Sequence, residues 1–142
     1  MRVIRDHVPQ ADLAGLYKSV DAFVLPSRGE GWGRPIVEAM AMGLPVIATN
    51  WSGMTEYMTN KNSYLIAVER LEEVVNGPFK GHRWALPCVK HLGELMRHVV
   101  TNRKEAQGKG RVARQDMETK YSPEVVGRKV IARLRSIDAQ VE

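Results

Sequence analysis

Cysteine is nearly absent from this chain of 142 residues, and Cys88 is the only one. A single cysteine permits no internal disulfide, which excludes a disulfide-stapled fold and favours a reducing compartment such as the cytoplasm. No apolar run approaches the roughly 18 residues of a membrane span, and the first ten residues, MRVIRDHVPQ, lack the apolar stretch of a signal peptide. What remains is an ordinary globular composition, 44% apolar and 26% charged, as expected of one domain or part of one.

Residues that hold metals or act as nucleophiles are also sparse. Cys88 and His91 form an isolated C-x-x-H pair, and His98 lies two helical turns beyond His91, too far to share an ion with it. His82 supplies no second pair. Ser27 lacks the G-x-S-x-G turn of serine hydrolases, and Cys88 has no recognisable base partner. We therefore expect neither a metal site nor a serine or cysteine nucleophile.

The net charge of +5 arises mainly beyond residue 102, where lysines and arginines alternate with acidic residues. Nucleic-acid-binding surfaces usually carry a denser basic stripe with several aromatic side chains for stacking. Tyr121 is the only aromatic residue in this region. The pattern favours solvated helical faces, and RNA binding by the basic tail stays open as an alternative.

The first half of the chain alternates helical and extended signals. Apolar spacing predicts an amphipathic helix over 12–20 with Asp12 as its N-cap, and Pro35 and Gly43 bound a second, short apolar helix over 35–42. Short apolar runs predict buried strands over 21–27, 45–49 and 63–68, with a loop and helical turn at 51–58. This alternation is typical of a parallel α/β sheet covered on both faces.

The second half has a different character. Residues 73–87 are rich in turn formers and predict a connector, whose Trp84 we expect to pack against the helical tail. Helices are predicted over 88–100, 103–119 and 123–138, the last with Ser122 as N-cap. We divide the chain into a partial Rossmann-like subdomain, 1–76, and a connector with C-terminal helices of the same domain, 77–142.

The stretch EGWGRPIVE, residues 30–38, places Glu30 before a glycine loop and Glu38 one turn into the following helix. In parallel α/β sheets such a loop faces the ligand crevice, and the helix start offers free N–H groups to a phosphate. Ionised carboxylates repel phosphate but accept hydrogen bonds from adjacent hydroxyls. A nucleotide sugar combines both chemistries. The simpler interpretation is that Glu38 meets the helix dipole and Glu30 is an ordinary loop residue.

The longer stretch DLAGLYKSVDAFVLPSRGEGWGRPIVEAMAMGLPVIATNWSGMTE, from residue 12 to 56, resembles the donor-binding half of GT-B glycosyltransferases of the retaining family 4 type. The resemblance rests on two glutamates separated by seven residues, with P-S before them and E-A-M-A-x-G-x-P-V-I-A after. It implies the C-terminal domain of a GT-B fold, an incomplete Rossmann-like sheet with a helical C-terminal segment. It also implies metal-independent transfer of a hexosyl group from a UDP- or GDP-linked sugar to an acceptor hydroxyl.

The resemblance assigns roles position by position. Glu30, the expected catalytic residue, would contact hydroxyls of the transferred sugar, and Glu38 the ribose of the nucleotide. The predicted donor-binding residues are Glu30, Gly31, Trp32, Gly33, Glu38, Gly53 and Glu56. Ser52 stands where the family more often has the first glycine of its second glycine loop, and Arg34 where an aliphatic residue is commonest.

Family members also carry an Arg/Lys pair for the diphosphate and an N-terminal acceptor domain, and this sequence contains neither. We expect residues 2–4 to form an edge strand and one edge of the neighbouring central strand to be bare, open to self-association or to the missing domain. On this interpretation the chain is a fragment, inactive alone. A non-catalytic nucleotide-binding or interaction module is the alternative.

Overall fold

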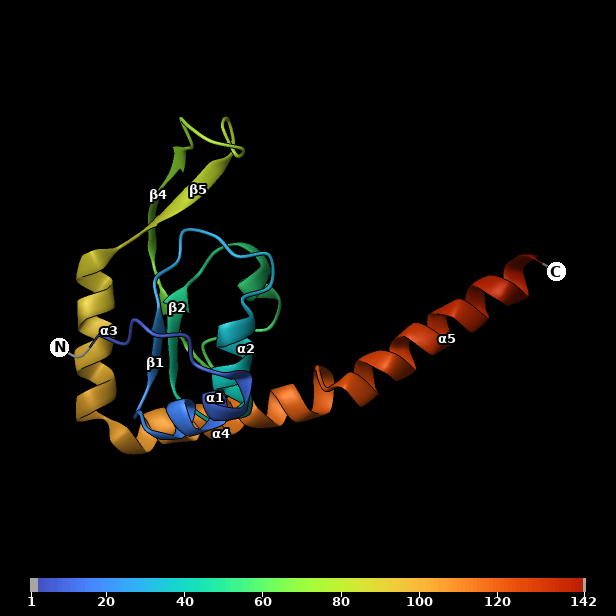
Figure 1. Cartoon of the computed structure of the whole chain (residues 1–142), viewed down its shortest axis with the longest axis horizontal. Coiled ribbons are helices and arrows are strands. Elements are labelled where there is room, and N and C mark those ends of the chain that lie inside the picture. Colours follow the sequence, from blue (N-terminus) through green and yellow to red (C-terminus); the bar gives the residue numbers. More distant parts are fainter. Residues whose placement is uncertain (1–2, 142) are drawn as a thin grey trace.

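The computed structural model describes residues 3–141, which form a small α/β domain with a long C-terminal helix (Figure 1). Three short strands, β1 (Phe23–Leu25), β2 (Val46–Thr49) and β3 (Tyr64–Ile66), make a parallel sheet in the order β1-β2-β3. Phe23 is in register with Val46, and Ile47 with Tyr64. The predicted parallel sheet is confirmed, and its strands lie within the predicted ranges.

The sheet is covered on both faces, and every residue of the central strand β2 is therefore buried. Val46 and Ala48 face a core built with α2 (Arg34–Ala41) and α4 (Arg103–Lys120). Ile47, between them, faces the opposite way, toward Val99 of α3 (Val89–Thr101). This alternation on a fully buried strand explains why its first three residues, Val46–Ala48, are all apolar.

Two glycines let helix α4 approach the end of α2. Gly43 follows the last turn of α2 with φ of +74°, the left-handed conformation that ends helices. A Cβ atom on Gly110 of α4 would lie 2.1 Å from the carbonyl oxygen of Gly43, so only glycine permits this contact. Helix α4 is thus part of the same packed unit as the sheet.

The segment predicted as a connector, 73–87, forms the end of one strand, the turn and the second strand of a β-hairpin. Strands β4 (Val68–Glu73) and β5 (Arg83–Pro87) pair antiparallel, and Figure 1 shows them projecting beyond the sheet. The prediction was wrong because the polar sequence of β4 has no apolar face and because residues 74–82 supply the turn signals. Gly77 and Gly81 of that turn both have positive φ. The boundary at 76/77 falls between the two strands.

Trp84 also differs from expectation. Its ring lies 5.8 Å, centroid to centroid, from that of Phe79, so it packs within the hairpin and not against the helical tail. At the N-terminus, Val3 and Ile4 are not in a strand, which corrects the predicted edge strand; Arg2 lies outside the described residues. Within residues 3–141, β2 is the only strand paired with β1.

The remaining helices lie close to their predicted ranges. Helix α1 (Gln10–Lys18) begins two residues before Asp12, which therefore lies in its first turn and is not its N-cap. Pro35 is the second residue of α2, after Arg34. Helix α5 (Pro123–Val141) starts as predicted, and the Ser122 hydroxyl accepts a 3.4 Å hydrogen bond from the Val125 N–H. Across residues 3–141 no helix combines the length and apolarity needed to cross a membrane.

Candidate functional site

The glycine–glutamate loop connects the carboxyl end of β1 to the start of α2. Gly33 caps α2 with φ of +77° and ψ of +56°, a conformation that suits glycine. It is also closely packed, since a Cβ atom there would lie 3.0 Å from the Tyr57 hydroxyl oxygen and 3.1 Å from Cδ1 of Ile36. The loop that carries Glu30 is therefore fixed at the end where the helix N–H groups begin.

A second loop, at the end of β2, holds the first one in place. The Gly53 N–H and the Ser52 hydroxyl both donate hydrogen bonds to the backbone oxygen of Glu30, at 3.1 Å and 2.8 Å. A Cβ atom on Gly53 would lie 1.9 Å from the Gly31 oxygen, so the loops touch backbone to backbone. Gly53 is required for this approach, because any side chain at this position would clash with the first loop.

Ser52 adopts a backbone conformation that usually favours glycine. Its φ is +68°, the only positive value found for a non-glycine residue among residues 3–141. This region is strained for residues with a side chain, and the strain persists because surrounding contacts fix the backbone. The hydrogen bond from Ser52 to Glu30 is one such contact, so the serine side chain contributes directly to the junction of the two loops.

Glu38 lies on the side of α2 that faces α1. Its Oε2 accepts a 2.9 Å hydrogen bond from the Tyr17 hydroxyl, and its Oε1 is 4.0 Å from Nη2 of Arg34. Burial, together with the hydrogen bond to Glu38 and its charge, raises the pKa of Tyr17 to about 12. Arg34, which the sequence left without a role, is thus an exposed partner for Glu38.

Glu30 lies on another side of the loop. Within residues 3–141 its carboxylate makes neither a hydrogen bond nor an ion pair with another side chain, although the residue is half-buried. It lines a hollow of about 520 Å³ together with residues of the second loop and of the hairpin. Glu38 lines a different hollow, of about 280 Å³, beside α1. The two glutamates therefore line two separate hollows.

Trp32 belongs to an aromatic cluster that sequence reasoning did not find. Its ring centroid is 5.0 Å from that of Tyr57 and 5.9 Å from that of Tyr121, and the Tyr57 hydroxyl donates to the Trp32 oxygen. Burial and the nearby charge of Glu30 raise the pKa of Tyr57. The three rings come from distant parts of the chain, so no local signal links them.

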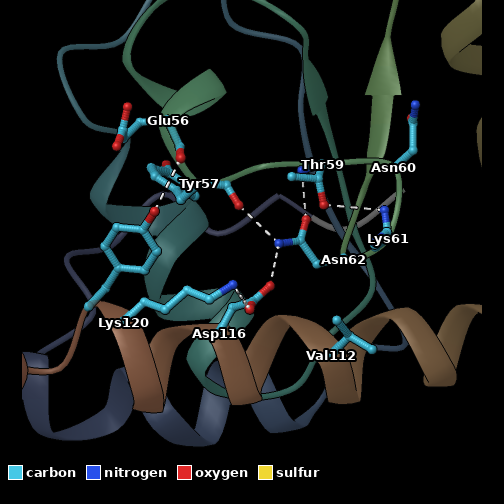
Figure 2. Close-up of a pocket in the computed structure, with 10 residues that line it drawn as sticks. Glu56, Tyr57, Thr59, Asn60, Lys61, Asn62, Val112, Asp116 and Lys120 are labelled. Atoms are coloured by element: carbon cyan, nitrogen blue, oxygen red, sulfur yellow. Dashed lines mark hydrogen bonds and ion pairs between the residues drawn. The ribbon is translucent and has the colours of Figure 1, made fainter.

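Glu56 lines a hollow of about 500 Å³ against α4, separate from the hollows of Glu30 and Glu38 (Figure 2). There the Asn62 side chain donates hydrogen bonds to the Tyr57 oxygen at 2.9 Å and to Asp116 at 2.8 Å. Lys120 pairs with the other Asp116 oxygen. These contacts hold the segment after η1 (Ser52–Glu56) against α4. Burial alone would raise the pKa of Asp116, but the hydrogen bonds from Lys120 and Asn62 lower it, and the net result is a lowered pKa.

The hairpin is joined to the glycine–glutamate loop by Arg28. The Ala85 N–H donates to the Arg28 oxygen at 2.9 Å, and the Arg28 side chain donates back to the Ala85 oxygen at 3.3 Å. Arg28 also forms a 2.7 Å ion pair with Glu72 of β4. The sequence could not indicate this contact, because the hairpin itself was predicted as a connector.

The residues first weighed as metal ligands have other contacts. The Cys88 sulfur caps α3 by accepting from the His91 N–H at 3.5 Å, and His91 Nδ1 accepts from the Ala67 N–H at 3.0 Å. His98 lies 2.9 Å from Glu105. In the described part of the chain, no group of three histidine, cysteine or acidic side chains could hold a metal ion.

A parallel α/β sheet with its glycine loop at the strand ends and closing helices is consistent with the C-terminal domain of a GT-B protein. The sequence profile of the family described as "Glycosyl transferases group 1" matches residues 3–77. The chain belongs to this family.

Similar proteins of known name are glycosyltransferases. O-antigen chain mannosyltransferase B of Escherichia coli is 46% identical over 50 residues, 35% of this chain and 13% of that protein. The lipopolysaccharide core biosynthesis mannosyltransferase LpsB of Rhizobium meliloti is 38% identical over 63 residues, 42% of this chain and 18% of that protein. The capsular polysaccharide biosynthesis glycosyltransferase CapM of Staphylococcus aureus is 25% identical over 128 residues, which cover 84% of this chain and 30% of that protein. The chain matches less than a third of the length of each.

Proposed function

We propose that this chain recognises the nucleotide diphosphate sugar used by a retaining hexosyltransferase. The observation that carries the proposal is the placement of Glu30 and Glu38 in separate hollows around the start of α2. An anionic diphosphate fits the start of that helix, where the peptide dipoles favour negative charge. The two carboxylates then accept hydrogen bonds from hydroxyls on either side of it.

The roles of the two glutamates differ. Glu38, oriented by Tyr17 at 2.9 Å, would bind the ribose of the donor nucleotide on the α1 side. Glu30, held by its backbone oxygen to Ser52 and Gly53, would bind hydroxyls of the transferred sugar. The backbone of Gly31, Trp32 and Gly33 would lie against the sugar and the diphosphate. Stabilisation of the diphosphate by the helix dipole would require no metal, and the donor nucleotide would be UDP or GDP.

Isothermal titration of the chain with UDP, GDP and ADP tests this function. We expect one diphosphate to bind, and Glu38→Ala to weaken that binding about tenfold, as the loss of hydrogen bonds to a charged group predicts. Glu94→Ala, at an exposed position of α3, is the matched control and should bind as the unaltered chain does. Absence of binding to all three nucleotides, or equal affinity in the Glu38 variant, would contradict donor recognition.

Catalysis is a separate question. The prediction that this stretch of sequence does not by itself transfer sugar stays a prediction, tested by incubating the chain with UDP-glucose or GDP-mannose and measuring release of the free nucleotide. Glu30→Gln keeps the size of the side chain and removes its charge. If any release occurs, this variant should slow it more than it weakens nucleotide binding.

A further inference from the structure

The hairpin β4–β5 forms one wall of the hollow that Glu30 lines. This wall is fixed by the contacts of Arg28 with Ala85 and Glu72, so the hairpin has a defined position over the glycine–glutamate loop. The hollow, of about 520 Å³, lies within the size range of small-ligand sites. Its remaining wall comes from Trp51 and Ser52 of the second loop.

Aromatic side chains dominate this hollow. Phe79 and Trp84 come from the hairpin and Trp51 from the opposite loop. The Phe79 side chain is 53% exposed although its ring lies close to that of Trp84. An exposed aromatic surface with a few polar groups beside it is typical of a binding site.

The hollow also carries polar side chains that can bind hydroxyls, those of Glu30, Ser52, His82 and Arg83. The Glu30 carboxylate accepts hydrogen bonds, and Arg83, on the hairpin strand β5, only donates them. A pyranose ring has apolar C–H faces and a rim of hydroxyls that both donate and accept. Its faces fit the aromatic rings, and its rim fits one acceptor and one donor side chain.

A nucleobase would also stack on aromatic rings, but the position of the hollow argues against it. Glu38 and Tyr17, which would orient the ribose, line the separate hollow beside α1. A nucleotide held by Glu38 therefore places its base away from the hairpin, and the diphosphate end leads toward Glu30. The hollow under the hairpin therefore lies at the end of the diphosphate that carries the sugar.

We propose that the β4–β5 hairpin completes a sugar-binding subsite, in which Trp84 and Phe79 hold a hexose ring whose hydroxyls bind Glu30 and Arg83. The assignment of Glu30 to a hydroxyl rests on the proposed function. The aromatic wall does not, because it would hold any hexose that reaches the hollow. That hexose is either the sugar of the donor or a sugar unit of the acceptor.

Titrations with two kinds of probe distinguish the two sources. The first kind compares UDP with UDP-glucose and GDP with GDP-mannose; the second uses methyl α-glucoside and methyl α-mannoside without nucleotide. The variants are Trp84→Ala and Phe79→Ala, the latter at an exposed position of the turn. Val75→Ala is the control, an exposed apolar residue of the same turn that does not line the hollow.

For a donor sugar, both aromatic variants weaken binding of the nucleotide sugar about fivefold and leave the bare nucleotide unchanged, as the loss of one aromatic contact predicts. For an acceptor sugar, they weaken binding of the methyl glycoside and leave the nucleotide sugar unchanged. If neither ligand responds to either variant, or if Val75→Ala has the same effect, the subsite does not exist. Nucleotide binding by the unaltered chain with no response in the variants overturns this inference alone. Glycoside binding that responds, with no nucleotide binding, overturns the proposed function alone.

Discussion

The hydroxyl of Tyr17 donates a 2.9 Å hydrogen bond to Oε2 of Glu38, which joins helix α1 to helix α2 at the candidate ribose site. Within residues 3–141, the ion-pair partner of Oε1 is Arg34, which is exposed and 4.0 Å away. A carboxylate held on one oxygen is oriented for a ligand on the other, and holding it before the ligand arrives reduces the entropy lost on binding.

Replacing Tyr17 with phenylalanine removes this bond and keeps the ring that packs 6.0 Å, centroid to centroid, from Phe23. We expect Tyr17→Phe to weaken nucleotide diphosphate binding about threefold to tenfold, because one hydrogen bond contributes about 0.5–1.5 kcal/mol. Calorimetry measures the change. Combined with Glu38→Ala, the tyrosine substitution should have no further effect, and additive losses in the double variant would show that the two residues act separately.

Ser52 offers a test of backbone strain. Ser52→Ala loses the hydrogen bond to the Glu30 oxygen and keeps a side chain at positive φ, so we expect the free energy of unfolding to fall by about 1 kcal/mol. Ser52→Gly loses the same bond but relieves the strain, and should be the more stable of the two variants by about 1 kcal/mol. Denaturant unfolding measures both. An alanine variant as stable as the glycine variant would mean that the positive φ costs nothing here.

Two glycines of α4 should respond oppositely to alanine. A Cβ atom on Gly110 would lie 2.1 Å from the backbone oxygen of Gly43, so Gly110→Ala must displace α4 from α2, with an expected loss of about 3 kcal/mol. Gly108, one half-turn away, has only the end of the Arg111 side chain nearby, at 3.8 Å. Gly108→Ala should stabilise the chain by up to about 1 kcal/mol through helix propensity. Similar effects at both positions would contradict the close packing of α4 on α2.

All four tyrosines of the chain have a raised pKa, with burial as the largest cause in each case. Tyr17 and Tyr64 both reach about 12. A raised pKa means that folding favours the neutral phenol, so its contribution is complete below the ordinary value of 10 and is lost as the pH rises through the folded value. We expect the free energy of unfolding to decline between pH 10 and about 12.

Tyr64→Phe should make that decline shallower, because it removes one of the groups that titrates. The Tyr64 hydroxyl donates a 3.2 Å hydrogen bond to Glu105, so the variant also has a lower free energy of unfolding at neutral pH. Tyrosinate absorbance followed alongside denaturant unfolding would check both. A stability that stays constant across the same pH window would contradict the raised values.

The parallel sheet could be predicted from the sequence because β2 is buried on both faces and its first three residues are therefore all apolar. The end of α2 could be predicted for a local reason as well: Gly43 takes the left-handed conformation that stops a helix. Such signals depend on neighbouring residues alone. The position of the glycine–glutamate loop follows directly from them, because it connects two elements whose identity was clear.

The hairpin could not be predicted for the opposite reason. Its first strand is polar and exposed, and it is positioned by Arg28, more than 40 residues away along the chain. The junction of the two loops has the same origin, since a positive φ at Ser52 opposes local preference and depends on contacts with Glu30. Wherever distant backbone contacts override local preference, the sequence pattern indicates which residues matter but not how they meet.

Helix α5 extends away from the sheet in Figure 1, and an apolar stripe along it is exposed: Val126, Val130, Ile131, Leu134 and Ile137. A helix of 19 residues with little tertiary support is only marginally stable in water. We therefore expect helix α5 to unfold separately from the rest of the domain on heating, while the sheet with its covering helices unfolds cooperatively. Heating should first remove helical signal gradually, before the aromatic signals of the body change. Anything that covers the stripe would merge the two transitions into one.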